Sequence, residues 1–156
     1  MIEIRVEGWG RARLECLVLD FNGTLARDGR LRSGTRTRLS QLARRIEIHV
    51  VTADTFGRAA SELHGIRCRL ALLAPGKQDL AKARYVRALG ADRVVALGNG
   101  RNDRRMLGIA ALGLAILGAE GAASDTLRAA DAVFTDVRDA LDALLHPLRL
   151  VATLRC

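Results

Sequence analysis

The chain contains, at residues 16–25, the stretch Cys16-Leu17-Val18-Leu19-Asp20-Phe21-Asn22-Gly23-Thr24-Leu25. Four apolar residues stop at an acid and continue into a polar turn with a glycine. A short continuous apolar run of this kind is typical of a strand buried on both faces in the middle of a parallel sheet. Ligands of open parallel sheets bind beyond the carboxyl ends of the strands. Asp20, Asn22 and Thr24 are therefore candidate functional residues.

On the C-terminal side of this stretch, strand-like and helix-like segments alternate. Apolar runs of strand length predict further strands at 46–51, 68–73, 94–97, 112–117 and 132–135. Apolar residues at helical spacing predict helices at 34–45, 55–63, 80–89, 103–111, 122–130 and 137–145. The last of these helices is expected to end the fold at His146-Pro147. The alternation predicts right-handed crossovers and an α/β fold, a three-layer α/β/α sandwich with a parallel Rossmann-like sheet.

On the N-terminal side, residues 2–6 and 11–15 alternate apolar and polar side chains around Gly8-Trp9-Gly10. This pattern predicts an N-terminal β-hairpin. The 156 residues contain no internal repeat, low-complexity tract or linker-like composition. We therefore expect residues 1–156 to form a single domain.

The composition narrows the class of protein. The formal net charge is +8, but aromatic residues make up only 3% and the arginines are scattered, so nucleic-acid binding is not expected. No run reaches the roughly 18 to 20 apolar residues of a membrane span. The N-terminus does not have the pattern of a signal peptide. A cytoplasmic location is the simplest interpretation.

The cysteines and histidines do not show the spacing of a metal site. An odd number of widely spaced cysteines argues against a disulfide framework and against a zinc site. The histidines have no ligand-spaced partner in the sequence, so we interpret them as structural or exposed. The residues concerned are Cys16, Cys68, Cys156, His49, His64 and His146.

Polar residues also follow two other predicted strands. Thr52 ends one of them, and Asn99, Asn102 and Asp103 follow another. Because the strands are parallel, Asp20 and Asp103 should meet at one edge of the sheet, where their hard oxygens would suit Mg²⁺. The sequence also allows simpler interpretations: Thr52 could cap the next helix, and an acid such as Asp103 is favoured in the first turn of a helix.

Three of these segments together resemble the motifs of the haloacid dehalogenase superfamily. Residues 17–25 resemble its first motif, Val50-Val51-Thr52 its second, and Gly98-Asn99-Gly100-Arg101-Asn102-Asp103 its fourth. The motifs occur in the order of the family, each ends a predicted strand, and the likeness extends over nearly the whole chain.

The resemblance implies a phosphatase that uses Mg²⁺ and passes through an aspartyl-phosphate. It makes Asp20 the nucleophile, and it assigns catalytic positions also to Asn22, Thr52 and Lys82. The phosphoryl group would be bound by Thr52, Ala53, Lys82 and Asn102. The metal would be held by Asp20, the backbone carbonyl of Asn22, Asn99 and Asp103.

The third motif of the family supplies a lysine, and the chain has two candidates. The helical stretch that begins at Lys82 is similar to the corresponding segment of the soluble P-type ATPase-like phosphatases. Lys77 follows Pro75-Gly76 in an expected loop. We favour Lys82 because the apolar spacing after it matches, and Lys77 stays open as the alternative.

Two departures from the family pattern predict slow chemistry. Asn22 stands where the phosphatases carry the acid that protonates the leaving group, and an amide cannot do so. Asn99 replaces a metal-binding acid, which should weaken the affinity for Mg²⁺. The alternative is a catalytically weakened protein that binds a phosphorylated ligand or a protein partner.

The chain also lacks room for the lid domain that many members of the family carry. Residues 25–47 leave space for a small flap around Arg27-Asp28-Gly29-Arg30 and one helix. Capless relatives take macromolecular substrates or borrow a neighbouring subunit as a lid. We therefore expect a phosphorylated small molecule or a phosphoprotein as the substrate, and a homo-oligomer, either a dimer or a tetramer.

Overall fold

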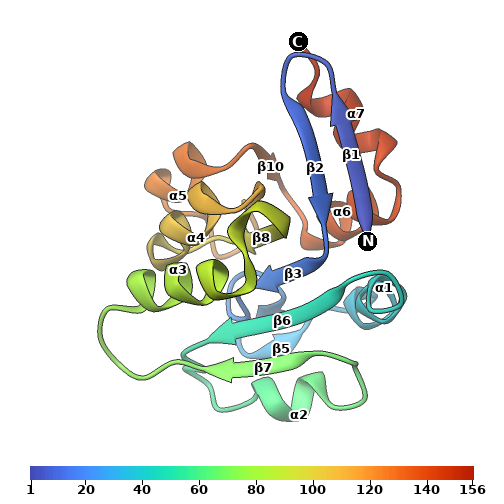
Figure 1. Cartoon of the computed structure of the whole chain (residues 1–156). Coiled ribbons are helices and arrows are strands. Elements are labelled where there is room, and N and C mark those ends of the chain that lie inside the picture. The colour runs from blue at the N-terminus through green and yellow to red at the C-terminus, as the bar shows by residue number, and fades with distance from the viewer.

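Six parallel strands form the central sheet of the computed structural model, which describes residues 1–156 (Figure 1). Their spatial order is β10 (Ala132–Phe134), β9 (Leu112–Ile116), β8 (Val94–Gly98), β3 (Cys16–Leu19), β6 (Glu47–Thr52) and β7 (Arg69–Leu72). From β3 the chain winds first to β7 and then, from β8, to the opposite edge at β10. The direction reverses between β3 and β8, which is where ligands of such sheets bind.

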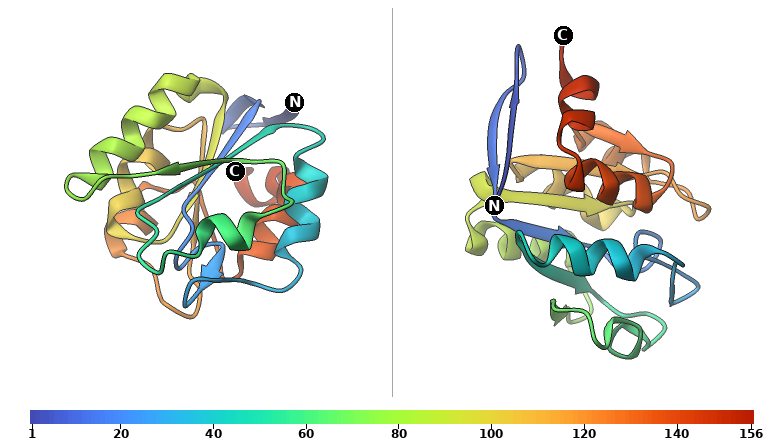
Figure 2. Two further views of the ribbon diagram at one scale, coloured as in Figure 1. Left: turned by 90° about the horizontal axis from the view of Figure 1, so that it is seen from below. Right: turned by 90° about the vertical axis from the view of Figure 1, so that its right-hand side faces the viewer.

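Helices cover both faces of this sheet, as Figure 2 shows in the view from below. One layer contains α3 (Gln78–Leu89), α4 (Arg104–Ile109) and α5 (Ser124–Ala129), and the other contains α1 (Thr35–Leu42) and α6 (Val137–Leu145). The short helix α2 (Ala59–Leu63) precedes the edge strand β7, and the 3-10 turns η1 (Ala91–Arg93) and η2 (Arg101–Asp103) flank β8. The predicted three-layer sandwich with a parallel sheet is confirmed.

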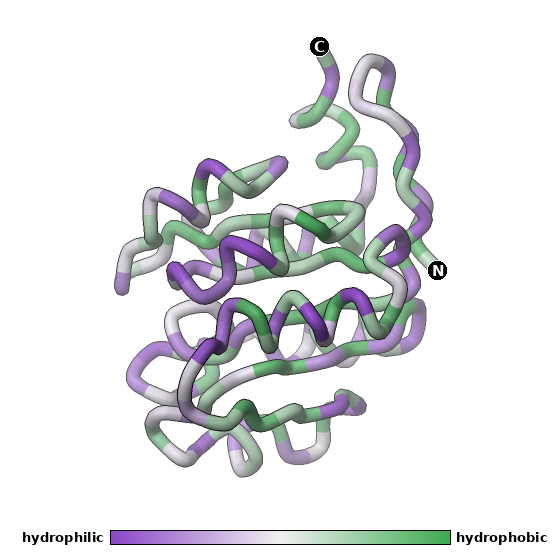
Figure 3. The backbone as a smooth tube through the Cα atoms, turned by 60° about the vertical axis from the view of Figure 1, so that its left-hand side comes forward, coloured by the Kyte–Doolittle hydropathy of each residue, from purple (hydrophilic) through white to green (hydrophobic).

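The central strand β3 is buried along its whole length because it contributes to the core on both faces. Leu17 and Leu19 belong to the core shared with α1 and α6, whereas Cys16 and Val18 pack with α3 and α4 on the other face. In Figure 3 the apolar tube segments run through the sheet, and the helices alternate apolar and polar residues. The continuous apolar run in the sequence reflects this two-sided burial.

The predicted N-terminal hairpin is present as β1 (Ile2–Val6) paired antiparallel with β2 (Gly10–Leu14). The prediction that the fold ends at His146-Pro147 is wrong, because a further helix, α7 (Leu148–Leu154), follows and packs against the hairpin (Figure 1). Proline is tolerated at the start of a helix, where its missing N–H has no partner to lose. The apolar residues after Pro147 cover the inner face of the hairpin.

Two short segments frame the carboxyl edge of the sheet. The predicted flap is a small hairpin of β4 (Ala26–Arg27) and β5 (Arg30–Leu31), whose turn residues Asp28 and Gly29 both have positive φ. This conformation matches the twist of the two strands. After β6, the helix begins at Ala59 rather than at residue 55, because Asp54 accepts hydrogen bonds from the Arg58 and Ala59 N–H groups and holds a turn. None of the helices combines the length and apolar character needed to cross a bilayer.

Candidate active site

A buried ion-paired group lies at the carboxyl end of β3. The Nζ atom of Lys82 is 2.6 Å from Oδ1 of Asp20 and 2.6 Å from Oδ1 of Asp103. Lys82 and Asp103 are completely buried, and Asp20 is 7% exposed. Charged side chains are rarely buried unless they are paired, and here one ammonium serves two carboxylates. Residues 20, 82 and 103 therefore form one unit although they are far apart in the sequence.

Three different elements position this unit. Asp20 follows β3 and extends its pairing with β8, since its N–H donates to the Leu97 carbonyl at 3.0 Å. Lys82 reaches the site from α3. The other carboxylate oxygen of Asp103, Oδ2, accepts from the N–H groups of Asn99 and Gly100 at 3.0 and 2.9 Å, which fixes the loop after β8. These protein donors engage both oxygens of Asp103.

The local electrostatics follow from burial and from the excess of carboxylates. Burial, together with the charge of Asp103, raises the pKa of Asp20 to about 7, although Lys82 acts in the opposite direction. Burial alone would lower the pKa of the Lys82 ammonium, but the two carboxylates outweigh burial and raise it above its usual range. When Asp20 is ionised, the unit carries one negative charge more than the Lys82 ammonium balances, and burial together with this excess is what raises the pKa of Asp20.

The polar turn after Asp20 contributes oxygens that are weakly bonded or unbonded. The Thr24 hydroxyl lies 3.4 Å from Oδ2 of Asp20 and 3.3 Å from Oδ1 of Asn99. Oδ1 of Asn22 is buried without a hydrogen-bond partner. Gly23 has φ +79, and a Cβ there would lie 2.5 Å from the amide of Asn99. The glycine is therefore required for the close approach of the two loops.

These oxygens fit a divalent cation. Oδ2 of Asp20 has only one long contact, the side-chain oxygen of Asn22 has no hydrogen-bond partner, and two carboxylates share the single ammonium of Lys82. Buried polar atoms without partners are rare in folded proteins and often mark an ion or a ligand site. Hard oxygen donors suit Mg²⁺ in particular, which needs only one or two carboxylates from the protein.

Thr52 and Ala53 end the neighbouring strand β6 at the same edge. The Thr52 side chain is buried, and its oxygen accepts a hydrogen bond from the Asp54 N–H at 3.0 Å. The residue thus stabilises the turn after β6, as the simpler interpretation of the sequence suggested. Its O–H can still donate to another group, because a hydroxyl is donor and acceptor at once. Ala53 is exposed.

The structure distinguishes Lys82 from Lys77 by their burial. Lys82 is buried against Asp20, whereas Lys77 precedes α3 at the surface and borders a polar depression of ≈ 370 Å³ with Asn102. The Asn102 side chain donates to Oε1 of Gln78 at 2.8 Å.

Thr126 on α5 supports the loop after β8, because its hydroxyl donates a hydrogen bond to the Gly100 carbonyl at 2.6 Å. Gln78 and Thr126 belong to no recognisable motif, so the sequence pattern does not indicate their roles.

A comparison with known proteins identifies a relative in an archaeon. No protein-family model matches the chain. The chain is 40% identical over 84 residues to the uncharacterized protein MJ0073 of Methanocaldococcus jannaschii, a match that covers 51% of this chain and 90% of the relative.

Solved structures of two phosphatases resemble this chain over nine tenths of its length. One is the 3-deoxy-D-manno-octulosonate 8-phosphate phosphatase from Moraxella catarrhalis in complex with magnesium, phosphate and KDO, with a TM-score of 0.68, 17% identity and 90% coverage of both chains. Another is the cobalt-bound deoxy-D-mannose-octulosonate 8-phosphate phosphatase from Haemophilus influenzae, with a TM-score of 0.66, 14% identity and coverage of 90% of this chain and 92% of that chain. At these identities the likeness concerns the fold.

Proposed function

We propose that this chain is a phosphatase with Asp20 as its nucleophile. The premise is that the chain belongs to one family with the archaeal protein MJ0073 and has the haloacid dehalogenase-like fold. The observation that supports this proposal is the buried contact of Lys82 with Asp20 and Asp103 at the switch point of the sheet. A purely structural role would not require two carboxylates and an ammonium at the position where such sheets bind ligands.

The first chemical step is an attack by a carboxylate oxygen of Asp20 on the phosphorus atom. A new bond joins Asp20 to phosphorus while the bond to the leaving oxygen breaks. The charge that spreads over the phosphoryl oxygens is met by the Lys82 ammonium and by the Thr52 hydroxyl, with Ala53 and Asn102 completing the phosphate-binding set. Water then attacks the phosphorus atom, releases inorganic phosphate and restores the Asp20 carboxylate.

The cation that we propose is Mg²⁺. Its ligands would come from Asp20, the Asn22 backbone carbonyl, Asn99 and Asp103. The contacts of Asp103 with Lys82 and with two backbone N–H groups also make it the anchor that holds the lysine in place. A bound Mg²⁺ would supply the positive charge that the unit of Asp20, Lys82 and Asp103 lacks, and it would help neutralise the phosphoryl oxygens.

The rate should be limited by the lack of an acid at position 22. The Asn22 amide cannot protonate the leaving oxygen or take a proton from the attacking water. The leaving oxygen must then take its proton from solvent, so esters with good leaving groups should react best. Slow hydrolysis of the aspartyl-phosphate is expected for the same reason.

We propose a phosphorylated small molecule or a phosphoprotein as the substrate, in the cytoplasm. The polar depression beside Asn102 is also lined by Lys77, Gln78 and Arg101, and none of its lining residues is hydrophobic. Such a surface suits the polar or anionic remainder of a phosphorylated compound.

The rim of the sheet suggests a homo-oligomer, a dimer or a tetramer. Phe56 after β6 and Leu72 at the end of β7 are 50% and 63% exposed. The double variant Phe56→Ser/Leu72→Ser should shift the mass measured by light scattering toward the monomer. Leu148→Ser changes an even more exposed residue on α7 and is the matched control. A wild-type protein that is monomeric at micromolar concentration would contradict this assembly.

The nucleophile is tested with Asp20→Asn, and Asp28→Asn in the exposed flap turn is the matched control. Beryllium fluoride with Mg²⁺ imitates an aspartyl-phosphate and should bind the wild type and Asp28→Asn, with one equivalent per chain by calorimetry. Asp20→Asn should abolish this binding and lower the hydrolysis of an aryl phosphate by roughly 10³-fold or more. Residual activity within about tenfold of the wild type would exclude Asp20 as the nucleophile. Binding without any turnover in the wild type would favour the weakened phospho-ligand binder instead.

A further inference from the structure

A second cluster of potential ligands lies at the other end of β3. The side chains of Cys16, Glu47 and His49 place one ligand atom each within 4.8 Å of one another. Cys16 pairs in register with Glu47 across β3 and β6, and Glu47 and His49 are two residues apart, so all three lie on one face of the sheet. That face is covered by α3.

The buried nitrogen of His49 is the observation that points to a ligand. His49 is 1% exposed, and its Nε2 atom has no hydrogen-bond partner. Its other nitrogen, Nδ1, is 3.0 Å from the hydroxyl of Tyr85 on α3. If Nδ1 donates its proton to the Tyr85 oxygen, Nε2 carries a free lone pair, and this atom lies 3.4 Å from Oε2 of Glu47. Metal-ligating histidines commonly have their second nitrogen held in this way.

The distances agree with a shared metal ion better than with a direct hydrogen bond. Nε2 of His49 is 3.4 Å from Oε2 of Glu47. This is longer than the usual 2.7–3.2 Å of an N–H···O hydrogen bond. Two ligands bound at about 2.0–2.1 Å to one tetrahedral zinc ion are about 3.4 Å apart. The more exposed Glu47 side chain can adjust, whereas Cys16 and His49 are fixed by the sheet.

We propose that Cys16, Glu47 and His49 form a binding site for a zinc-class transition metal ion, with a water molecule as the fourth ligand. One sulfur, one nitrogen and one carboxylate oxygen select zinc or cobalt over magnesium. The Cys16 thiol loses its proton to solvent on binding, so thiolate and carboxylate together neutralise a divalent ion. Binding thus changes the charge of the site from −1, that of the Glu47 carboxylate, to zero. The exposed Arg69, which lies 3.8 Å from Glu47, can then turn to solvent, and Arg93 keeps its pairing with Glu15.

This site is distinct from the proposed active site. Cys16 and Asp20 are four residues apart on an extended strand, which is about 13 Å. The metal would join β3 to β6 at their amino ends and take no part in phosphoryl transfer. Its role is to stabilise the sheet on which Asp20 is placed.

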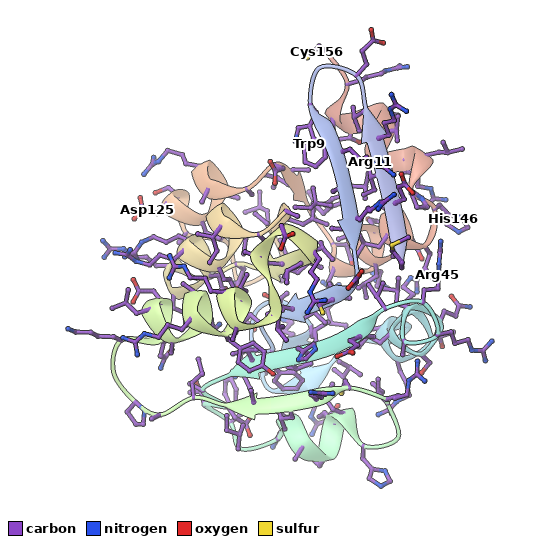
Figure 4. All side chains as sticks on the ribbon, viewed as in Figure 1. Trp9, Arg11, Arg45, Asp125, His146 and Cys156 are labelled. Carbon is purple, nitrogen blue, oxygen red and sulfur yellow. The ribbon has the colours of Figure 1, made fainter.

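Cobalt(II) tests the site, because a thiolate ligand gives a charge-transfer band that an all-oxygen site cannot give. A Cys156→Ser background removes the exposed terminal thiol, which Figure 4 shows at the tip of the hairpin, far from β6. One cobalt per chain should give the band, and zinc should abolish it by displacement. The band should be lost in Cys16→Ala, remain in Cys68→Ala as the matched cysteine control, and remain in Asp20→Asn.

Two further variants keep the test decisive if Cys16→Ala fails to fold. Glu47→Gln changes a largely exposed side chain and should weaken zinc binding by about tenfold or more. Tyr85→Phe keeps the packing and should weaken it about 10- to 100-fold by releasing Nδ1 of His49. Absence of the band, or a band that disappears in Cys68→Ala and persists in Cys16→Ala, would overturn the site. Unchanged affinity in Tyr85→Phe would overturn the role of Tyr85.

Discussion

The two ends of β3 contain polar groups that are buried in different ways. At the carboxyl end, the Lys82 ammonium contacts a carboxylate oxygen of Asp20 and one of Asp103, each at 2.6 Å. At the amino end, Cys16 and His49 are equally buried, but the His49 nitrogen that faces the cluster has no partner. The carboxyl end thus has one carboxylate more than it has cations, and the amino end has an imidazole nitrogen without a hydrogen-bond partner.

Because of this difference, we expect each end to bind a different kind of cation. Oxygen donors and net negative charge favour a hard ion at the carboxyl end, whereas sulfur and nitrogen favour a softer ion at the amino end. The difference also predicts which substitutions are costly. Removal of Lys82 leaves two buried carboxylates without a cation. Removal of Cys16 or His49 at the amino end leaves no buried charge unpaired, because Glu47 is largely exposed and pairs with Arg69.

The largest effect is expected for Lys82→Met. The substitution keeps the length of the side chain but leaves Asp20 and Asp103 buried without a cation. We expect a loss of about 3–5 kcal/mol in the free energy of unfolding, measured by urea denaturation, together with loss of activity. Lys77→Met, at the surface, is the matched control and should leave the stability unchanged within about 0.5 kcal/mol. Equal stability of the two variants would show that the buried charges need no compensation.

The next effect concerns turnover. Asn22→Asp restores an acid beside Asp20 in a nearly isosteric form, and a positioned general acid typically contributes about 10²–10⁴-fold in rate. Turnover of aryl phosphates should rise, and more so for substrates with poor leaving groups. Steady-state rates for a series of aryl phosphates, whose phenol leaving groups differ in pKa, measure this dependence. A folded Asn22→Asp variant that binds Mg²⁺ and is no faster than the wild type would favour the binding protein over the enzyme.

Asn99→Asp should change metal affinity rather than the proton transfer. It replaces a neutral side chain, which we propose as a metal ligand and which lies next to Thr24, with a charged one. Mg²⁺ binding should tighten by roughly tenfold, as judged by the Mg²⁺ dependence of beryllium fluoride binding. The cobalt–thiolate band at the amino end should not change. Altered zinc affinity in this variant would contradict the independence of the two ends.

The smallest effect is expected at a partly exposed ion pair away from β3. Asp136 caps α6 by accepting from the Arg138 N–H at 2.9 Å, and hydrogen bonds from the Arg138 side chain help lower the pKa of Asp136 to about 2. Asp136→Ala should cost about 1 kcal/mol at pH 7.

The pH dependence of this pair has a defined sign. Because the pKa of Asp136 is lowered on folding, its contribution is fully present above pH of about 4 and is lost as the pH falls toward about 2. The difference in unfolding free energy between the wild type and Asp136→Ala should therefore shrink over this interval. A difference that stays constant down to pH 2 would show that the pair does not depend on the charge of Asp136.

The sequence alone was sufficient to predict the sheet and its carboxyl edge. Two-sided burial requires a continuous apolar run, as in Cys16–Leu19, and the polar residues after each run mark where the strands end. The sequence does not predict helix α7, because Pro147 after a helix indicates an end, although a proline is equally suited to the start of a helix. The sequence also does not determine whether Lys77 or Lys82 is the third-motif lysine, because the burial of a side chain depends on the packing of distant segments.

Contacts between distant segments depended on the tertiary structure. Spacing in the sequence does not connect Cys16 with Glu47 and His49, and the sequence argued against a zinc site. Parallel pairing of β3 with β6 brings the three side chains onto one face, and α3 adds Tyr85. Local sequence patterns determine the helices and strands, because the spacing of apolar and polar residues sets which side of an element can be buried. The register between strands and the packing of helices decide which of these residues share one site.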